Sequence, residues 1–278
     1  MSLVQPLLVQ PLLVLAGAGK MGGAMLEGWL KLGLDGAGIV VIDPAPAADM
    51  LALCEKAGVR VNPPPAGLTP PETLVLAVKP QMLDAAAAGL EALAGPETLL
   101  ISIIAGKTVA NLQARFPRAR AIVRCMPNTP AAVGRGVTGA FASPGLNAGH
   151  KSTANALLAA IGGVVWVEDE GLIDAVTAVS GSGPAYVFYL TECLARAGEA
   201  QGLPADLAMR LARATVEGSG ELMFRDPASQ PETLRKNVTS PAGTTAAALD
   251  VLMADDGLAP LMTRAVAAAR RRAGELSG

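Results

Sequence analysis

Leu12-Leu13-Val14-Leu15-Ala16 runs directly into Gly17-Ala18-Gly19-Lys20-Met21-Gly22, so an apolar stretch ends in the pattern G-x-G-x-x-G. A strand that leads through this pattern into a helix is typical of a dinucleotide-binding fold. Gly17 permits the tight turn, Gly19 lets the backbone approach a pyrophosphate, and Gly22 lets the helix pack closely on the sheet. The helix N-terminus then offers free N–H groups to the phosphates. The stretch therefore predicts a dinucleotide site.

A second apolar stretch makes a chance glycine-rich turn the weaker interpretation. Ile39-Val40-Val41-Ile42 ends in Asp43, about 20 residues further on, where an acid that binds the ribose is expected. Asp43 should accept a hydrogen bond from a ribose 2′-hydroxyl and repel a 2′-phosphate, which favours NADH over NADPH. Pro44-Ala45-Pro46 offers no arginine for a phosphate, and Arg60 is the nearest basic candidate from another element. We expect both cofactors to be used, with NADH at least competent.

The composition limits the classes of protein to consider. A chain of 278 residues is long enough for two domains, and its net charge of −2, with one basic run at residues 270–272, argues against a nucleic-acid surface. Three widely spaced cysteines lack the pairing of zinc sites, so they predict small core residues in a reducing cytoplasm and no bound metal. Mean hydropathy is +0.41, yet no apolar run reaches the roughly 18 residues of a membrane span. The apolar surplus indicates a subunit interface.

The N-terminus carries a repeated Val-Gln-Pro-Leu-Leu, at residues 4–8 and again at 9–13. The repeat lacks the basic region and the cleavage site of a signal peptide. Only its second copy leads into the glycine-rich turn, and the sequence leaves open whether the first copy is native.

Short apolar runs alternate with helical stretches, which predicts an α/β fold with a mostly parallel sheet. After the first two strands we expect strands at residues 73–78, 99–103, 121–126, 136–141 and 163–167, with a helix at 148–161. Parallel sheets bind ligands beyond the carboxyl ends of their strands. The loops at Lys79-Pro80, Ala105-Gly106 and Asn128-Thr129-Pro130 should therefore line one crevice.

The pattern changes after residue 168, where only helices are expected. One should start at Pro184 and run to about Gln201, a second should open at Pro204 and stop before Arg225, a third should end at Gly257, and a last should run from Pro260 to Arg272. Their apolar faces are rich in small residues that permit close approach. We therefore expect a dinucleotide-binding domain at residues 1–168 and an all-helical domain at 169–278 that forms a homodimer.

Three loop segments carry a resemblance to a known family. Residues 124–130 (RCMPNTP), 180–187 (SGSGPAYV) and 240–245 (SPAGTT) resemble signature segments of pyrroline-5-carboxylate reductase. With residues 17–22 and 77–80 they occur in that family's order and span almost the whole chain. The resemblance implies NAD(P)H-dependent reduction of 1-pyrroline-5-carboxylate to L-proline, the last step of proline synthesis. It also implies a Rossmann domain and a helical dimerisation domain, with dimers that often form larger rings. The family that this chain resembles more often uses NADPH.

The available side chains suit an imine better than a ketone or an alcohol. Reduction of a carbonyl needs an acid or base near the reacting oxygen. The single histidine, His150, precedes a helix and is expected to be solvated, and no lysine follows Ser180-Gly181-Ser182-Gly183, where related hydroxyacid dehydrogenases carry theirs. A protonated imine accepts hydride directly, so positioning and one hydrogen bond to nitrogen matter more than a strong acid.

The resemblance assigns roles to particular residues. Thr245 should bond the ring nitrogen, while Ser240 and the amides around Gly243 and Thr244 hold the carboxylate; Thr245 as a simple helix cap is the alternative. Ala242 stands where the family usually has glycine, and alanine stiffens the turn. The expected cofactor residues are Gly17, Gly19, Lys20, Met21, Gly22, Asp43, Ala77, Val78, Lys79, Pro80, Ser102 and Asn128.

Several of these assignments have a structural alternative. Lys79 is either a cofactor ligand or a solvated lysine at a helix start, and Asn128 either contacts the nicotinamide end or orders its own turn through its side chain. Ser102 either touches the cofactor or only packs. Tyr186 and Tyr189 are expected to be core or interface aromatics. At the level of function, a reductase of another substrate in the same superfamily and a non-catalytic dinucleotide sensor remain the alternatives.

Overall fold

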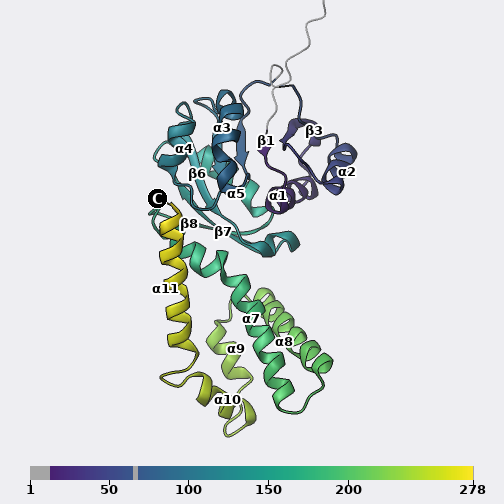
Figure 1. Ribbon diagram of the computed structural model, residues 1–278, viewed down its shortest axis with the longest axis vertical. Helices are drawn as coiled ribbons and strands as arrows, with labels where there is room; N and C mark the ends of the chain where they lie inside the picture. The colour runs from purple at the N-terminus through teal and green to yellow at the C-terminus, as the bar shows by residue number, and fades with distance from the viewer. Residues whose placement is uncertain (1–12, 65–67, 278) are drawn as a thin grey trace, which may run out of the picture. The chain divides into compact units, whose positions relative to one another are not determined.

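A computed structural model describes residues 13–64 and 68–277 (Figure 1). These residues divide into two compact units: unit 1 extends to Gly181 and includes the chain from Arg270 onward, and unit 2 comprises Ser182–Ala269. The first copy of the N-terminal repeat and most of the second lie outside the described residues.

Unit 1 is built on one eight-stranded sheet with the order β3-β2-β1-β4-β5-β6-β7-β8. The strands are β1 (Leu13–Ala16), β2 (Ile39–Ile42), β3 (Arg60–Val61), β4 (Thr73–Leu76), β5 (Leu99–Ser102), β6 (Ala121–Met126), β7 (Gly136–Ala142) and β8 (Gly162–Val167). All neighbouring strands are parallel except β6 and β7. The predicted mostly parallel sheet is thus confirmed.

Helices cover both faces of this sheet, as expected for parallel strands joined by crossovers. The helices of unit 1 are α1 (Lys20–Lys31), α2 (Ala48–Ala57), α3 (Leu83–Leu90), α4 (Val109–Arg115), α5 (Ala148–Ala159) and α6 (Leu172–Val176). Side chains of α1, α2 and α5 fill one apolar cluster and those of α3 and α4 fill the other. The loops that directly follow β1 and β4 lie at the carboxyl edge of the sheet, where each crossover begins.

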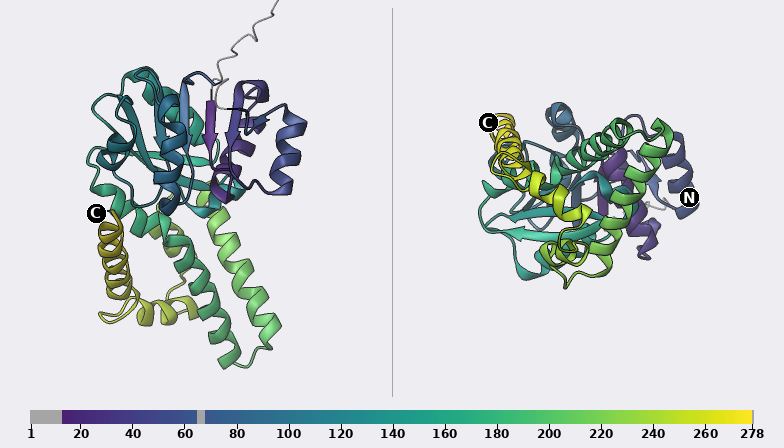
Figure 2. Two further views of the ribbon diagram at one scale, coloured as in Figure 1. Left: turned by 45° about the horizontal axis from the view of Figure 1, so that its top comes forward. Right: turned by 90° about the horizontal axis from the view of Figure 1, so that it is seen from below.

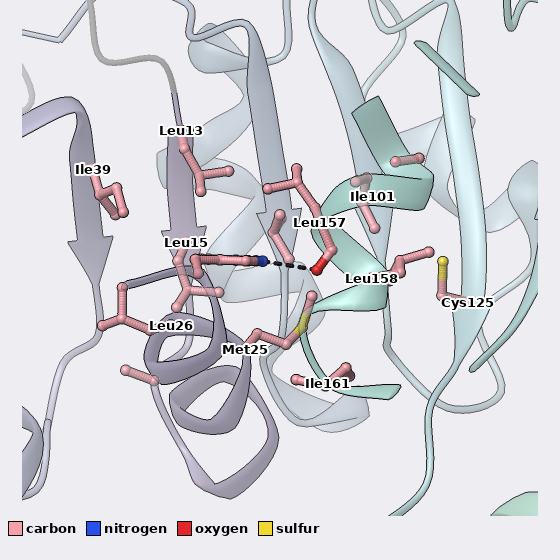
Figure 3. Close-up of a cluster of buried hydrophobic side chains, with 14 of the residues drawn as sticks. Leu13, Leu15, Met25, Leu26, Ile39, Ile101, Cys125, Leu157, Leu158 and Ile161 are labelled. Atoms are coloured by element: carbon pink, nitrogen blue, oxygen red, sulfur yellow. Dashed lines mark hydrogen bonds between the residues drawn. The ribbon is translucent and has the colours of Figure 1, made fainter. Parts of the chain in front are cut away.

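The first cluster shows how closely the glycine-rich turn is tied to the core (Figure 3). Met25 and Leu26 of α1 are buried in the same apolar cluster as Leu13 and Leu15 of β1. Trp29 is also buried, and its Nε1 donates to the carbonyl of Leu157 in α5 at 2.9 Å. Packing of α1 on β1 thus fixes the turn between them.

The expected strands of unit 1 are present with small shifts in their ends. The stretches expected at 73–78 and 99–103 pair only as far as Leu76 and Ser102, after which the chain leaves the sheet. The two-residue strand β3 was not expected, because it is too short for an apolar period. The helix expected at 148–161 ends at Ala159.

Unit 2 consists of helices, in agreement with the expectation. They are α7 (Gly183–Ala200), α8 (Ala205–Arg225), α9 (Pro231–Asn237), α10 (Thr244–Leu252) and α11 (Leu258–Ser277), whose last residues from Arg270 belong to unit 1. Figure 2 shows α7 and α8 side by side. A Cβ on Gly198 of α7 would lie 3.3 Å from the Cβ of Ala208 in α8, so small residues let these helices approach closely.

Three expectations for these helices were wrong in detail. The last helix begins at Leu258 rather than at Pro260, because proline is tolerated anywhere in a first turn, and it continues past Arg272 to Ser277. The third helix ends at Leu252, since residues 254–257 close a separate turn in which the N–H of Gly257 donates to Ala254. Helix α9 was not expected.

Among residues 13–64 and 68–277, no helix combines the length and the apolar character needed to cross a membrane. The same residues contain no group of three or more metal-ligating side chains arranged around a common point. All three cysteines are free; Cys54 and Cys125 lie in the core as expected, whereas Cys193 is only half-buried.

Candidate functional site

The glycine-rich turn has the geometry that its sequence predicts. Gly17 has φ +93°, and a Cβ there would lie 2.7 Å from the carbonyl oxygen of Ala77. A Cβ on Gly22 would collide with the carbonyl of Gly17, whereas one on Gly19 would meet no atom of the described residues within 4 Å. Gly17 and Gly22 are therefore required by close packing, and the backbone at Gly19 is open to a ligand. These features fit a bound pyrophosphate.

A hollow of about 550 Å³ adjoins this turn. Its lining includes Ala18, Gly19 and Lys20, together with Met50 of α2 and Val133, the last residue of the short 3-10 helix at residues 129–133 that follows β6. Lys20 is exposed at the first position of α1, and Met21 packs partly against the first apolar cluster. Lys20 thus supplies a positive charge beside the turn.

Asp43 is held against the glycine-rich turn. One oxygen of its carboxylate accepts the N–H of Ala18 at 2.7 Å, and the other accepts the N–H of Ala45 at 2.9 Å. The structure therefore shows a contact that was not predicted: the carboxylate braces the turn, in addition to any role toward a ribose.

The loop after β4 contributes the neighbouring part of this edge. The N–H of Ala77 donates to Ala16 at 2.7 Å, which joins the ends of β4 and β1. Val78 is half-buried, and Lys79 is exposed just before the short 3-10 helix η3 (Pro80–Met82). The contact between Gly17 and Ala77 brings two predicted cofactor segments together.

Ser102 is buried at the end of β5, and its hydroxyl accepts the N–H of Ile104 at 3.3 Å. This bond turns the chain away from the sheet. It gives Ser102 a local structural role and leaves its contact with a cofactor as a prediction.

Asn128 does not order its own turn through its side chain, so that alternative was wrong. It is buried, its Oδ1 accepts the N–H of Val137 at 2.9 Å, and its Nδ2 donates to the carbonyl of Ser180 at 3.1 Å. Ser180 lies in a π-helical turn, Thr177–Gly181, a kind of irregularity that is frequent at functional sites. Asn128 therefore ties the loop after β6 to this turn.

An ionic cluster below that loop was missed by the sequence analysis. Arg124 of β6 is buried, and its guanidinium lies 3.1 Å from Glu170 and 3.3 Å from Asp174. Glu170 also accepts the N–H of Val109, and Asp174 also accepts the hydroxyl of Ser277 at 3.2 Å. A basic residue inside the apolar stretch 121–126 was the available signal, since a buried arginine requires partners.

His150 differs from the expectation of a solvated side chain. It is half-buried in the first turn of α5, and its Nδ1 is buried without a hydrogen-bond partner among the described residues. Nothing in the structure gives this residue a role in the site.

The predicted substrate loop lies in unit 2, whereas the predicted cofactor residues all belong to unit 1. Ala242 has φ +57°, and the N–H of Gly243 donates to the carbonyl of Ser240 at 3.1 Å. A Cβ on Gly243 would collide with the hydroxyl oxygen of Ser240, so the Ser240 side chain would have to rotate away to admit another residue there.

This turn leads directly into α10. Gly243 is the N-cap residue and the helix begins at Thr244, so the proposal that Thr245 is the cap was wrong. Thr245 is instead half-buried within the first turn. The first-turn N–H groups of a helix lack partners within the helix, so Thr244 and Thr245 offer donors that suit a carboxylate.

Taken together, the fold and the glycine-rich turn at the carboxyl edge of the sheet define a dinucleotide-dependent oxidoreductase with a Rossmann domain and a helical domain. Residues 170–276 match the family model for pyrroline-5-carboxylate reductase dimerisation, and residues 12–106 match the model for NADP oxidoreductase, coenzyme F420-dependent. The first of these descriptions indicates a homo-oligomer.

Individual proteins are similar over the whole length. A pyrroline-5-carboxylate reductase of Pseudomonas aeruginosa is 38% identical over 96% of this chain and 97% of its own. Among solved structures, a pyrroline-5-carboxylate reductase from Coxiella burnetii superposes with a TM-score of 0.88 at 34% identity, covering 97% of this chain and 99% of that one. A pyrroline carboxylate reductase of Plasmodium falciparum with NADP bound gives 0.76 at 28% identity, covering 96% and 98%. The chain belongs to the pyrroline-5-carboxylate reductase family.

Proposed function

We propose that this protein reduces 1-pyrroline-5-carboxylate to L-proline by hydride transfer from NADPH or NADH, the last step of proline biosynthesis. The observation that carries the proposal is the 38% identity to a pyrroline-5-carboxylate reductase over 96% of the chain. The residues of both units agree with it, since unit 1 has a dinucleotide turn and unit 2 has a hydroxyl-rich turn at a helix N-terminus.

On the substrate side, the turn at residues 240–245 performs the recognition. The amides around Gly243 and Thr244 and the hydroxyl of Ser240 hold the carboxylate, and the hydroxyl of Thr245 bonds the ring nitrogen. Such contacts orient the imine carbon and need no strong acid, because the imine arrives protonated.

On the cofactor side, the proposal uses the residues at the carboxyl edge of the sheet. Gly17, Gly19 and Gly22 admit the pyrophosphate, with Lys20 and Met21 in the first turn of α1. Ala77, Val78, Lys79 and Pro80 line the neighbouring loop, Asp43 faces the adenosine ribose, and Ser102 and Asn128 lie toward the nicotinamide end. When bound, the cofactor supplies the hydride.

The proposal extends to the assembly. We propose a homodimer through the C-terminal helices, a ring of such dimers, a cytoplasmic location and a domain boundary after residue 168. The exposed apolar side chains of α7, including Phe188 and Leu190, support the dimer. Sedimentation velocity at several protein concentrations measures the number of copies.

The test of the reaction is the loss of reduced-nicotinamide absorbance with purified protein and 1-pyrroline-5-carboxylate, run in parallel with NADH and NADPH. Turnover with either cofactor is expected. Binding of a dinucleotide without turnover would overturn the proposed substrate, and other cyclic imines would then separate a related reductase from a non-catalytic sensor.

Thr245 gives a sharper test of the substrate site. Thr245→Val removes the hydroxyl at nearly constant shape and should lower kcat/KM for the imine. The fall should correspond to a loss of about 1–3 kcal/mol of transition-state stabilisation, the cost of an unpaired polar group. Thr245→Ser should retain most of the activity, and Thr263→Val, in α11 of the same unit, should have no effect. Equal loss of NADH affinity would mean that Thr245 only supports the fold.

A further inference from the structure

Asn62 follows the short strand β3 and makes two hydrogen bonds with Asp43, the residue that follows β2. Its Oδ1 accepts the N–H of Asp43 at 3.0 Å, and its Nδ2 donates to the carbonyl of Asp43 at 2.7 Å. No role is assigned to Asn62 in the proposed reaction. The two bonds nevertheless fix the backbone of Asp43, the residue expected to face the ribose.

The side chain of Asn62 continues the sheet by one step. Val41 pairs with Val61, and the N–H of Asn62 donates to the carbonyl of Val41 at 2.9 Å, as the parallel ladder requires. Asn62 then has φ +47°, so its backbone turns away before Pro63. Its amide replaces the missing backbone partner of Asp43, and asparagine is among the few residues that tolerate this conformation.

The contacts continue from Asp43 to the glycine-rich turn. With its backbone fixed by Asn62, Asp43 presents its carboxylate to the N–H groups of Ala18 and Ala45. Each carboxylate oxygen retains a further lone pair that can accept a ribose hydroxyl. A 2′-phosphate beside this fixed carboxylate would be repelled, because like charges at close range disfavour each other.

We propose that Asn62 is a positioning residue that sets the preference between NADH and NADPH by fixing the carboxylate of Asp43 against the glycine-rich turn. The inference rests on the proposed function, since it concerns the cofactor of that reaction. Release of Asp43 lets the carboxylate move away from the ribose, and discrimination against the 2′-phosphate then falls.

The experiment measures dissociation constants for NADH and NADPH by cofactor fluorescence, without substrate. Asn62→Gly keeps a residue that tolerates positive φ and removes the amide. The ratio of NADPH affinity to NADH affinity should rise about three- to tenfold, the range that one or two modest hydrogen bonds correspond to. Asp43→Ser should shift the ratio in the same direction.

Two controls separate positioning from general damage. In the Asp43→Ser background, Asn62→Gly should leave the ratio nearly unchanged, because residues that act through one contact are not additive. Asn111→Ala removes another unit 1 asparagine, whose Oδ1 accepts the N–H of Thr108 at 3.2 Å, and should leave the ratio unchanged.

Each outcome decides the question. An unchanged ratio in Asn62→Gly, or an equal shift with and without Asp43, would overturn the inference alone; the second result would favour a direct effect on the cofactor or one through Arg60. Failure of the unaltered protein to bind either dinucleotide would overturn the proposed function and this inference together.

Discussion

The helices of the two units differ in what they bury. In unit 1, α1 buries Met25, Leu26 and Trp29 against the sheet. In unit 2, Ala195 is the one buried residue of the fully described helix α7, while Phe188 is 63% exposed and Tyr189 is 60% exposed. Unit 1 therefore has its own core, whereas the apolar faces of unit 2 require another surface to cover them.

The largest expected effect tests the self-sufficiency of unit 1. Trp29→Ala removes a fully buried side chain and should lower the free energy of unfolding by about 3–5 kcal/mol, as measured by urea denaturation. Trp166→Ala is the matched control, since Trp166 is only half-buried and bonds the exposed Asn155. Equal losses in the two variants would show that the core does not dominate the stability of unit 1.

The second prediction concerns the ionic cluster that holds the end of α11 to the sheet. The side chain of Arg124 is 5% exposed, while Glu170 and Asp174 are 27% and 20% exposed. Arg124→Met leaves two carboxylates without their cation and should cost about 3 kcal/mol, the lower end for a broken buried pair, since both acids can still reach water.

Amide hydrogen exchange should locate this effect. Exchange in the last turn of α11 should become faster in Arg124→Met, because Ser277 bonds both Arg124 and Asp174. Arg115→Met is the control: its bond to Asp84 lies at the surface, and its loss should change little. Unchanged exchange at residues 270–277 would mean that the cluster does not anchor this helix.

The third prediction tests whether a second copy covers unit 2. Phe188→Ser should raise the dissociation constant of the oligomer by about 30-fold, or about 2 kcal/mol, the usual effect of a central aromatic residue of an interface. Leu32→Ser is the control in unit 1, since Leu32 is 65% exposed there. Sedimentation equilibrium measures both variants, and dissociation by Leu32→Ser instead would assign the interface to unit 1.

The contrast between the units also explains which features could be predicted from the sequence. The strand at Ile39–Ile42 and the glycine-rich turn follow from local apolar runs and from glycines that the backbone requires. The exposed apolar face of α7 follows from helical spacing, which predicts a face but not what covers it.

The contacts that join distant residues could not be predicted in the same way. Asn128 bonds Ser180, 52 residues further on, and Arg124 contacts Ser277, which is 153 residues away. Such pairs depend on how whole elements pack, and no local pattern encodes them. The hydrogen bonds between Asp43 and Asn62 could not be predicted for a related reason, since they depend on a strand of only two residues.

The fourth prediction concerns the buried thiol of Cys125 in unit 1. Burial raises the pKa of the Cys125 thiol above its ordinary value of 9.0. A thiol with a raised pKa in the folded state loses its proton first in the unfolded state, so its contribution is intact below pH 9 and is lost as the pH rises. Above pH 9 this thiol should lower the free energy of unfolding by about 1.4 kcal/mol per pH unit.

Urea denaturation between pH 8 and 10.5 measures this slope. Cys125→Ala should reduce the decline with pH by about that amount. An identical slope in the unaltered protein and in Cys125→Ala would show that the Cys125 thiol does not titrate differently in the two states.

The smallest effect compares Asn62 of unit 1 and Ala242 of unit 2, the two non-glycine residues with positive φ in the described part of the chain. Asn62 of unit 1 has φ +47° and makes two side-chain bonds, whereas Ala242 of unit 2 has φ +57° and has no polar side chain to compensate. Ala242→Gly relieves about 1–2 kcal/mol of steric cost and adds about 0.4–1 kcal/mol of unfolded-chain entropy, so it should raise the free energy of unfolding by at most about 1.6 kcal/mol. Asn62→Gly should lower it, because the two bonds are lost.

Ala247→Gly, inside α10, is the control and should cost up to about 1 kcal/mol. If Ala242→Gly instead destabilises the protein as much as Ala247→Gly does, the left-handed backbone of the turn at residues 240–245 is not strained. Its shape would then depend on the bond between Gly243 and Ser240, which Ser240 makes through its backbone.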